Sequence, residues 1–206
     1  MIERTSEATI QEKAALRQQF RAFRAGLSEA EYAARSAALV AQIQTVPELR
    51  QAQTVHTYWP MVQRREIDLR PLIDWLQRSG KQIVLPVVDT FESTPAPRLR
   101  HVRYESAEAL RPNQWDIHEP TDGKSVSIEA IDAVVVPALG AGRNGHRLGY
   151  GKGFYDAFLR RLTVPTVCPV YAGCLVERMP AEAHDVPLRL VITEDEIIRF
   201  YPDVTS

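Results

Sequence analysis

The segment IDAVVVPALGAGRNGHRLGYGKGFYD, residues 131–156, carries the clearest structural pattern in this chain of 206 residues. Its first part, Ile131–Val136, is apolar apart from Asp132, as expected for a strand that is covered on both faces. Pro137 ends that strand, a glycine-rich loop follows, and a helix is predicted at about residues 153–162. This order predicts part of an open α/β sheet, in which ligands bind at the carboxyl ends of the strands.

The loop after this strand has the composition of a binding site for a polyanion. It holds six of the ten glycines of the chain, and glycine lets a backbone approach a phosphate closely and adopt positive φ. Arg143, Arg147 and Lys152 add positive charge, and the following helix would add the positive end of its dipole. The loop is not a P-loop, because Gly153 follows Lys152 where Ser or Thr is required. The alternative interpretation is a flexible surface loop.

Asp156 falls in the first turn of the predicted helix, directly beside the loop. Magnesium is held by one or two carboxylates together with phosphate oxygens, so this position suits a Mg²⁺ ligand. The alternative is a structural role, either toward the helix dipole or in an ion pair with Arg160 four residues later.

Strand and helix patterns alternate through the rest of the chain. They predict one domain over residues 1–206 of the α/β class, with three layers, α/β/α, and a central, largely parallel sheet. Residues 89–97 are predicted to be a loop and residues 105–130 to be mostly irregular. The predicted helices cover residues 9–26, the stretch from a capping box at Ser28 to just before Pro47, and 70–78; the further predicted strands cover 55–59, 82–88, 99–104, 166–171, 188–193 and 197–201.

The first predicted helix has an apolar stripe and a basic edge. Lys13, Arg17 and Arg24 fall together on that edge at 100° per residue. On spacing alone, a solvated basic face is the simpler interpretation, and a contact with an anionic ligand is the other.

Composition excludes several classes of protein. The formal net charge is −1, so no overall basic field would attract nucleic acid. No apolar signal segment begins the chain and no apolar run of about 18 residues occurs, so we expect neither a secretion signal nor a membrane helix. Cys168 and Cys174 match no zinc or redox spacing and are expected to be buried thiols of a cytoplasmic protein.

The stretch from Arg147 to Asp156, RLGYGKGFYD, resembles the signature R-L-G-x-G-x-G-[YF]-Y-D of the 5-formyltetrahydrofolate cyclo-ligase family. All fixed positions of the pattern are present, and the resemblance extends over nearly the whole chain. It implies an enzyme that uses ATP, with Mg²⁺, to convert 5-formyltetrahydrofolate to 5,10-methenyltetrahydrofolate, releasing ADP and phosphate. ATP would phosphorylate the formyl oxygen, the N10 amine would attack the same carbon, and phosphate would leave.

The resemblance also assigns residues to ATP and to the metal. Asp156 and Asp185 would hold Mg²⁺, and Tyr155, Lys152 and Arg147 would act beside the reacting groups, although core packing is an equal alternative for Tyr155. The residues implied to bind ATP are Lys13, Arg17, Arg147, Leu148, Gly149, Tyr150, Gly151, Lys152, Gly153, Phe154 and Tyr155.

Four residues are implied to bind the folate: Trp59, Glu66, Trp115 and Phe154. Core packing is the alternative for both tryptophans, and a helix-entry acid is the alternative for Glu66. The chain departs from the family pattern in three places. The segment between Pro60 and Glu66 is longer and contains Arg64-Arg65, Ala141-Gly142 stands where Phe-Asp is usual, and Arg189 stands where an acid is usual.

These departures keep other functions open. A paralogue on the same scaffold could use ATP on a different substrate, and a non-catalytic sensor could bind a folate or a nucleotide without turnover. The expected partners are ATP and a reduced folate with one or more glutamates, with no nucleic acid and no membrane, and the expected state is a monomer or a weak homo-oligomer. An RNA-binding module is disfavoured by the net charge and by the lack of a basic-aromatic stripe.

Overall fold

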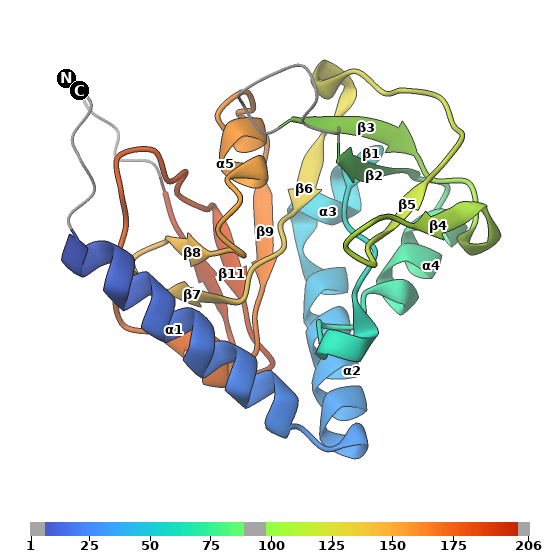
Figure 1. The fold of residues 1–206 in the computed structure, drawn as a ribbon. Coiled ribbons are helices and arrows are strands. Elements are labelled where there is room, and N and C mark those ends of the chain that lie inside the picture. Colours follow the sequence, from blue (N-terminus) through green and yellow to red (C-terminus); the bar gives the residue numbers. More distant parts are fainter. Residues whose placement is uncertain (1–6, 89–97, 202–206) are drawn as a thin grey trace.

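The computed structural model describes residues 7–88 and 98–201. Its centre is a seven-stranded sheet with the order β12-β11-β9-β6-β1-β2-β3 (Figure 1). The five inner strands run parallel, and β3 and β12 pair antiparallel at the two edges. The largely parallel α/β sheet predicted from the sequence is therefore confirmed. The strands are β1 (Thr54–His56), β2 (Gln82–Val88), β3 (Leu99–Arg103), β6 (Ala133–Val135), β9 (Thr166–Pro169), β11 (Leu190–Ile192) and β12 (Ile197–Arg199).

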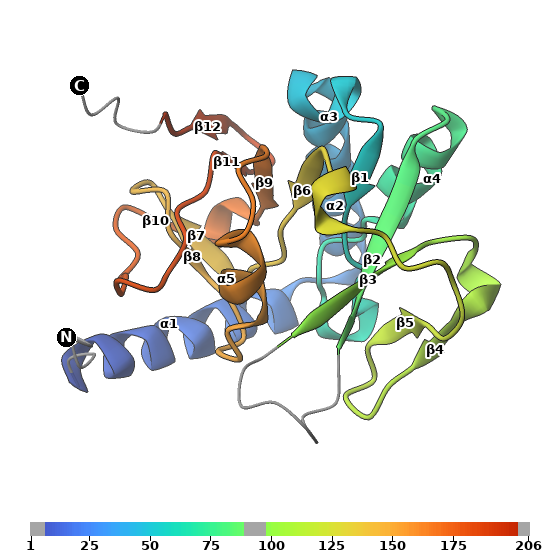
Figure 2. The ribbon, with the colours of Figure 1, turned by 90° about the horizontal axis from the view of Figure 1, so that it is seen from above.

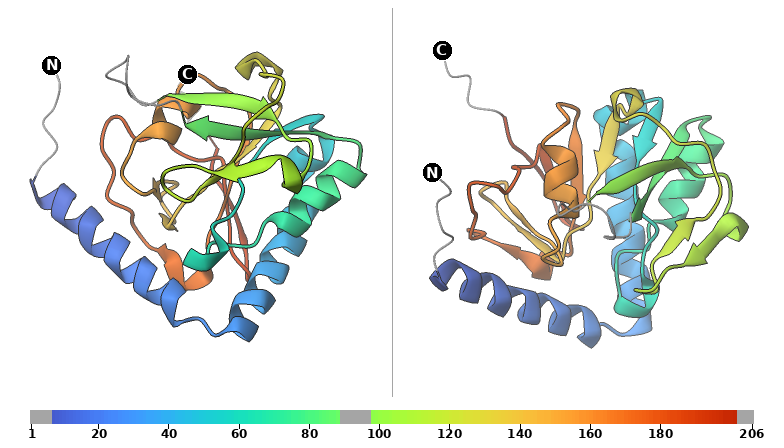
Figure 3. Two further views of the ribbon diagram at one scale, coloured as in Figure 1. Left: turned by 45° about the vertical axis from the view of Figure 1, so that its right-hand side comes forward. Right: turned by 45° about the horizontal axis from the view of Figure 1, so that its top comes forward.

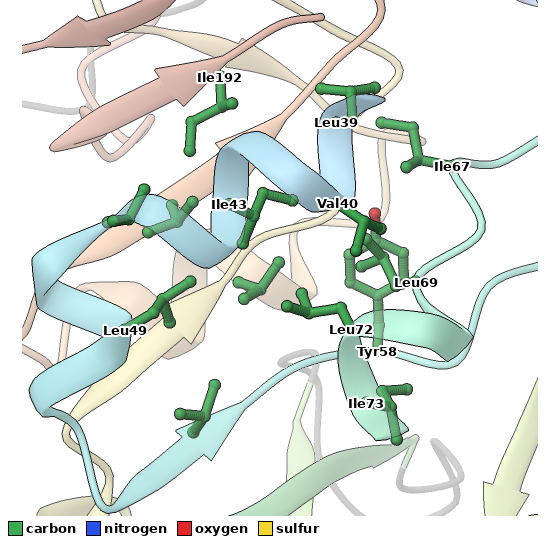
Figure 4. Close-up of a cluster of buried hydrophobic side chains, with 14 of the residues drawn as sticks. Leu39, Val40, Ile43, Leu49, Tyr58, Ile67, Leu69, Leu72, Ile73 and Ile192 are labelled. Carbon is green, nitrogen blue, oxygen red and sulfur yellow. The ribbon is translucent and has the colours of Figure 1, made fainter. Parts of the chain in front are cut away.

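Alternate residues of the inner strands β6, β9 and β11 face two separate cores. In β6, Ala133 and Val135 belong to one cluster of buried side chains, while Val134 belongs to the other. The first cluster contains side chains of α2 (Glu29–Thr45), α3 (Pro47–Gln51) and α4 (Arg70–Arg78). Figure 4 shows this cluster, which contains Leu39, Val40 and Ile43 of α2 together with Leu72 and Ile73 of α4. The second cluster contains Phe158 and Leu159 of the short helix α5 (Phe154–Leu159). Burial on both faces explains the continuous apolar runs of these strands.

Helix α1 (Glu7–Gly26) extends beside the sheet rather than over it, next to a small sheet of order β10-β7-β8 (Figure 3). Its strands are β7 (Gly140–Gly142), β8 (Arg147–Leu148) and β10 (Leu175–Val176). Phe20 of α1 occupies the space that a Cβ at Gly140 would need, at 2.3 Å. The turn into α2 has the predicted capping box, in which Ser28 and Glu31 bond reciprocally.

Residues 105–130 are more ordered than the sequence predicted. They form the antiparallel hairpin of β4 (Leu110–Pro112) and β5 (His118–Pro120), seen at the side of the sheet in Figure 2. Short 3₁₀ turns cover Val62–Arg64, Ala107–Ala109, Ile128–Ala130 and Ala172–Cys174. The predicted loop 89–97 lies outside the described residues. The strands predicted at residues 55–59 and 188–193 are shorter in the structure, where they cover Thr54–His56 and Leu190–Ile192.

The strand order reverses between β1 and β6. From β1 the chain continues to β2 on one side, and from β6 it continues through β7, β8 and α5 to β9 on the other side. Open α/β sheets form their ligand crevice at such a point, outside the carboxyl ends of the strands. Residues 136–153 follow the carboxyl end of β6, so the glycine-rich loop occupies this position. Among the described residues, no helix is both long and apolar enough to cross a membrane.

Candidate active site

The structure divides the glycine-rich loop into two parts with different roles. Gly140 and Gly142 lie in buried β7, where an added Cβ would collide with Phe20 or with Met179. At these two positions glycine is needed for close packing. The expectation that all six glycines form a phosphate cradle is therefore wrong for Gly140 and Gly142. Gly151 and Gly153, with φ of 89° and 72°, have the left-handed backbone that the cradle hypothesis requires. The open part of the loop is thus residues 149–153.

Helix α1 brings two cations to this part of the loop. The Nε of Arg17 donates a hydrogen bond to the carbonyl oxygen of Gly149 at 3.0 Å, and its guanidinium lies beside Gly151. One turn earlier, the Nζ of Lys13 lies 2.6 Å from a carboxylate oxygen of Glu182 and 2.6 Å from one of Asp185. Lys13 is only 6% exposed, so a solvated basic face is the wrong interpretation for this position.

The pKa values of Lys13 and Asp185 reflect this pairing. Burial acts to lower the pKa of Lys13, but the hydrogen bonds and charges of Asp185 and Glu182 outweigh it, so that the pKa is raised from 10.5. Burial likewise acts to raise the pKa of Asp185, and the hydrogen bonds from Lys13 and from the backbone of Glu182 bring it below 3.8. Both groups are therefore charged at neutral pH.

Arg147 and Asp156 form a second ion pair at the other side of the loop. A guanidinium nitrogen of Arg147 lies 2.9 Å from Asp156 Oδ1, and the same oxygen accepts from the backbone of Val186 at 3.4 Å. The partner of Asp156 is thus Arg147 rather than the Arg160 considered as the structural alternative. Arg160 donates instead to the carbonyl of His184. The contacts with Val186 and His184 bring segment 182–186 against α5.

Arg143 does not join this group. Its guanidinium lies 2.5 Å from Glu196 and 3.3 Å from Glu177, and its side chain is largely exposed. The residue leaves β7 in the tight turn before β8, which directs it toward β12 and away from residues 149–153. The expectation that Arg143 adds positive charge to the phosphate cradle is therefore wrong. Lys152 lies exposed within the open part of the loop.

Glu66 and Tyr150 connect the loop to the segment after β1. Glu66 is buried, and one of its carboxylate oxygens accepts from the backbone N–H of Met61 at 2.9 Å. Its other oxygen accepts a hydrogen bond from the Tyr150 hydroxyl. Burial, followed by the charge of Glu66, raises the pKa of Tyr150 well above 10.0, so its hydroxyl keeps the proton. Arg24 lies 3.5 Å from the same hydroxyl oxygen.

The aromatic residues predicted to bind a substrate occupy three places. Trp59 is half-buried with its ring centroid 5.9 Å from that of Tyr104. Trp115 is half-buried in the β4–β5 turn, which contacts the segment after β1 through a 2.6 Å bond from Gln63 to Asp116. Phe154 begins α5. The next residue, Tyr155, has a buried hydroxyl without a hydrogen-bond partner among the described residues, and its ring centroid lies 6.0 Å from that of His56.

The carboxylates around the loop fit a divalent cation in chemical type. Glu182, His184 and Asp185 each offer a ligand atom within 4.8 Å of the others, and Asp156 offers a further carboxylate in its pair with Arg147. Carboxylate oxygens with phosphate oxygens are the usual environment of Mg²⁺. Glu182 was not singled out from the sequence, although it lies three residues before Asp185.

A parallel sheet with cations and carboxylates gathered in a loop at its carboxyl edge has the architecture of a ligand-binding α/β enzyme. Comparison with protein families matches residues 9–194 to the 5-formyltetrahydrofolate cyclo-ligase family. The chain belongs to this family.

Individual relatives support this membership. A 5-formyltetrahydrofolate cyclo-ligase of Escherichia coli is 35% identical over 161 residues, which cover 76% of this chain and 86% of the relative. A cyclo-ligase of Haemophilus influenzae is 28% identical and covers 86% and 95% of the two chains. The solved structure of Aquifex aeolicus 5,10-methenyltetrahydrofolate synthetase superimposes with a TM-score of 0.77 at 28% identity, covering 94% of this chain and 99% of the other.

Proposed function

We propose that this protein cyclises 5-formyltetrahydrofolate to 5,10-methenyltetrahydrofolate and converts ATP to ADP and phosphate. The observation that carries the proposal is the meeting of three distant segments around residues 149–153. Lys13 and Arg17 come from α1, Arg147 and Asp156 from the loop and α5, and Asp185 from the segment before β11. Family membership and the names of the relatives support the same activity.

In this proposal the triphosphate lies along residues 147–155. Arg17, Arg147, Lys152 and Lys13 offset its negative charge, while the amides of Gly149, Gly151 and Gly153 and those between them approach the phosphate oxygens. The positive φ values of Gly151 and Gly153 support this role, because successive amides can then point to one side of the loop. Leu148, Tyr150, Phe154 and Tyr155 complete the proposed ATP contacts.

Asp156 and Asp185 would hold Mg²⁺, with Glu182 close to the second of them. The metal would neutralise phosphate charge during transfer of the phosphoryl group. In the structure, Lys13 pairs with Asp185 and Arg147 pairs with Asp156. Binding of Mg²⁺ and ATP would exchange those pairs for metal–carboxylate and cation–phosphate pairs, which keeps the region close to neutral in both states.

The folate would lie on the Glu66 side of Tyr150. The carboxylate of Glu66 suits the N–H donors of a pterin, and Trp59, Phe154 and Trp115 would line or cover the ring. The formyl oxygen would face the terminal phosphate near Tyr155 and attack it; N10 would then attack the formyl carbon, and phosphate would depart. Holding these groups in line accounts for most of the rate enhancement that the protein would need to supply.

The exposed and buried side chains support two further parts of the proposal. Cys168 and Cys174 are buried free thiols, which suits a reducing cytoplasm. Ile10 and Tyr201 are the exposed large apolar side chains of residues 7–88 and 98–201, and these two do not form a broad apolar surface, which suits a monomer or a weak homo-oligomer.

The test mixes the protein with ATP, Mg²⁺ and 5-formyltetrahydrofolate and follows the absorbance of the methenyl product together with released phosphate. We expect both signals to rise in equal amounts and to depend on all three components. Phosphate release without methenyl product would point to a different substrate for the same ATP site. Binding of both ligands without either product would instead identify a sensor.

A further inference from the structure

Two buried histidines lie next to each other on neighbouring parts of the central sheet. His56 is the last residue of β1, and His101 lies in β3, with β2 between the two strands. His56 is 0% exposed and His101 is 7% exposed. Because the strand order reverses between β1 and β6, His56 stands at the carboxyl edge where open α/β sheets bind their ligands.

These histidines pack against two aromatic residues of α5. The ring centroid of Phe158 lies 4.7 Å from that of His56 and 4.4 Å from that of His101, and the centroids of the two histidines are 5.2 Å apart. The ring of Tyr155 completes the group, 6.0 Å from His56 and 6.1 Å from Phe158. Helix α5 therefore rests on both strands through this group of four rings.

The group contains buried polar atoms that have no hydrogen-bond partner among residues 7–88 and 98–201. They are Nδ1 and Nε2 of His56, Nδ1 of His101 and the hydroxyl oxygen of Tyr155. Buried polar groups in folded proteins are nearly always hydrogen-bonded, and leaving one unpaired destabilises the fold. An apolar side chain at the end of β1 would fill the same space without this penalty, so packing alone does not explain His56.

The two histidines are suited to accept a hydrogen bond at neutral pH. Burial, followed by the charge of His101, holds the pKa of His56 well below 6.5, and burial, followed by the charge of Arg161, lowers the pKa of His101 to about 4. A neutral imidazole has one N–H donor and one bare nitrogen that accepts, and the Tyr155 hydroxyl can donate. One buried water can bridge such groups where they do not touch.

We propose that His56 is a positioning residue, which joins the Tyr155 hydroxyl to His101 in a hydrogen-bonded chain and thereby fixes Tyr155 beside the reacting groups. The inference rests on the proposed function. Tyr155 as a whole is half-buried although its hydroxyl is buried, so the ring can border the ligand while the sheet holds the hydroxyl. Asp156 follows directly in α5, so the same contact would steady the proposed metal ligand. Such fixed geometry acts on the rate of the reaction rather than on ligand affinity.

The first experiment compares two substitutions of similar volume at His56. His56→Leu removes both nitrogens and should lower kcat by about tenfold while the KM for ATP stays within about twofold. His56→Gln keeps a hydrogen-bonding group and should retain more of kcat than His56→Leu. A role in packing alone predicts the opposite order, because leucine suits an apolar site better than glutamine. A kcat of His56→Leu equal to or above that of His56→Gln would overturn the inference.

A double substitution tests whether the two side chains act together. Tyr155→Phe removes only the hydroxyl and should lower kcat about as much as His56→Leu does, and the double variant should lose no more than either single variant. Losses that multiply in the double variant would contradict a shared chain. The control is His118→Leu, an exposed position in β5, which should alter neither kcat nor the KM for ATP.

A measurement without substrate separates this inference from the proposed reaction. The ¹⁵N signals of the imidazole nitrogens report which of them accept a hydrogen bond. The signal of the bare nitrogen of His56 should move in Tyr155→Phe, whereas the signals of His118 should not. This shift in a protein that does not turn over 5-formyltetrahydrofolate would refute the reaction and leave the contact in place. Unmoved His56 signals would overturn the contact, whatever the activity.

Discussion

The two ends of α1 present their cations in different ways. Near its start, Lys13 contacts two carboxylates, and the neighbouring Arg147 is paired with Asp156. Near its end, Arg21 and Arg24 face a cavity that has arginines on the opposite wall and no carboxylate in its lining among the described residues. The first region is balanced before any ligand binds, whereas the second retains excess positive charge. A ligand that carries its own metal ion would leave the first region close to neutral, as the proposed function requires.

The largest effect on turnover and stability should come from removing the negative charge of Asp156, which pairs with Arg147. Asp156→Asn removes the proposed metal ligand and leaves Arg147, whose side chain is 4% exposed, without a charged partner. We expect turnover to fall by at least about 100-fold. We also expect a loss of about 2 kcal/mol in the free energy of unfolding, since a partly buried ion pair is broken. Steady-state kinetics at several Mg²⁺ concentrations and urea unfolding measure the two effects.

Asp122→Asn provides the matched control, because Asp122 is exposed in the stretch after β5. It should change neither turnover nor unfolding. Turnover of Asp156→Asn restored to the unaltered level at high Mg²⁺ would remove Asp156 from the metal site. The stability loss without a kinetic loss would make the Arg147 pair purely structural.

A smaller effect is expected from removing the charge of Lys13, which contacts Glu182 and Asp185. Lys13→Met keeps much of the side-chain volume but removes the ammonium group that contacts Glu182 and Asp185. We expect the KM for ATP to rise by about tenfold and the free energy of unfolding at pH 7 to fall by about 2 kcal/mol. The KM for the folate should change less, because the proposed folate contact Glu66 lies with Tyr150 beside Arg24, about three turns further along α1.

The pH dependence of this loss follows from the two pKa shifts. The pKa of Asp185 is lowered by folding from 3.8, so its stabilising contribution is present above that value and is lost as the pH falls through the lower folded pKa. The raised pKa of Lys13 makes its contribution disappear only as the pH rises above 10.5. The difference in unfolding free energy between Lys13→Met and the unaltered protein should therefore be constant from about pH 5 to 9 and shrink below about pH 4. A difference that stays constant down to pH 3 would contradict this assignment.

The sequence predicts the fold well because its signals are local. The capping box at Ser28 and the apolar run of β6 each specify an element within a few residues. The β4–β5 hairpin was missed, since its strands are three residues each. Its turn depends on Asn113, whose side-chain oxygen accepts hydrogen bonds from the backbone N–H groups of Trp115 and Ile117. Short strands carry too few residues for a period to be recognised.

The site was only partly predictable, because its contacts are between distant segments. Lys13 meets Asp185 across 172 positions, and no local pattern indicates that pairing. Family resemblance supplied both residues, but not the ion pair that joins them. The cavity lined by Arg21, Arg24, Arg64 and Arg65 could not be predicted for the same reason, since these residues come together only after α1 packs beside Tyr150.

The smallest effect should come from replacing Arg143, which lies in the glycine-rich segment but outside the group formed by Lys13, Arg147, Asp156 and Asp185. Its charge is already paired with Glu196 and Glu177 on the exposed side of β7. Arg143→Ala should therefore leave the KM for ATP and the melting temperature within experimental error, since exposed ion pairs contribute little. Lys152→Ala is the informative comparison: it removes a cation nine positions later in the same segment and should raise the KM for ATP severalfold. Equal effects of the two substitutions would mean that the loop acts through its overall charge, and the division of this segment at residue 149 would have no functional meaning.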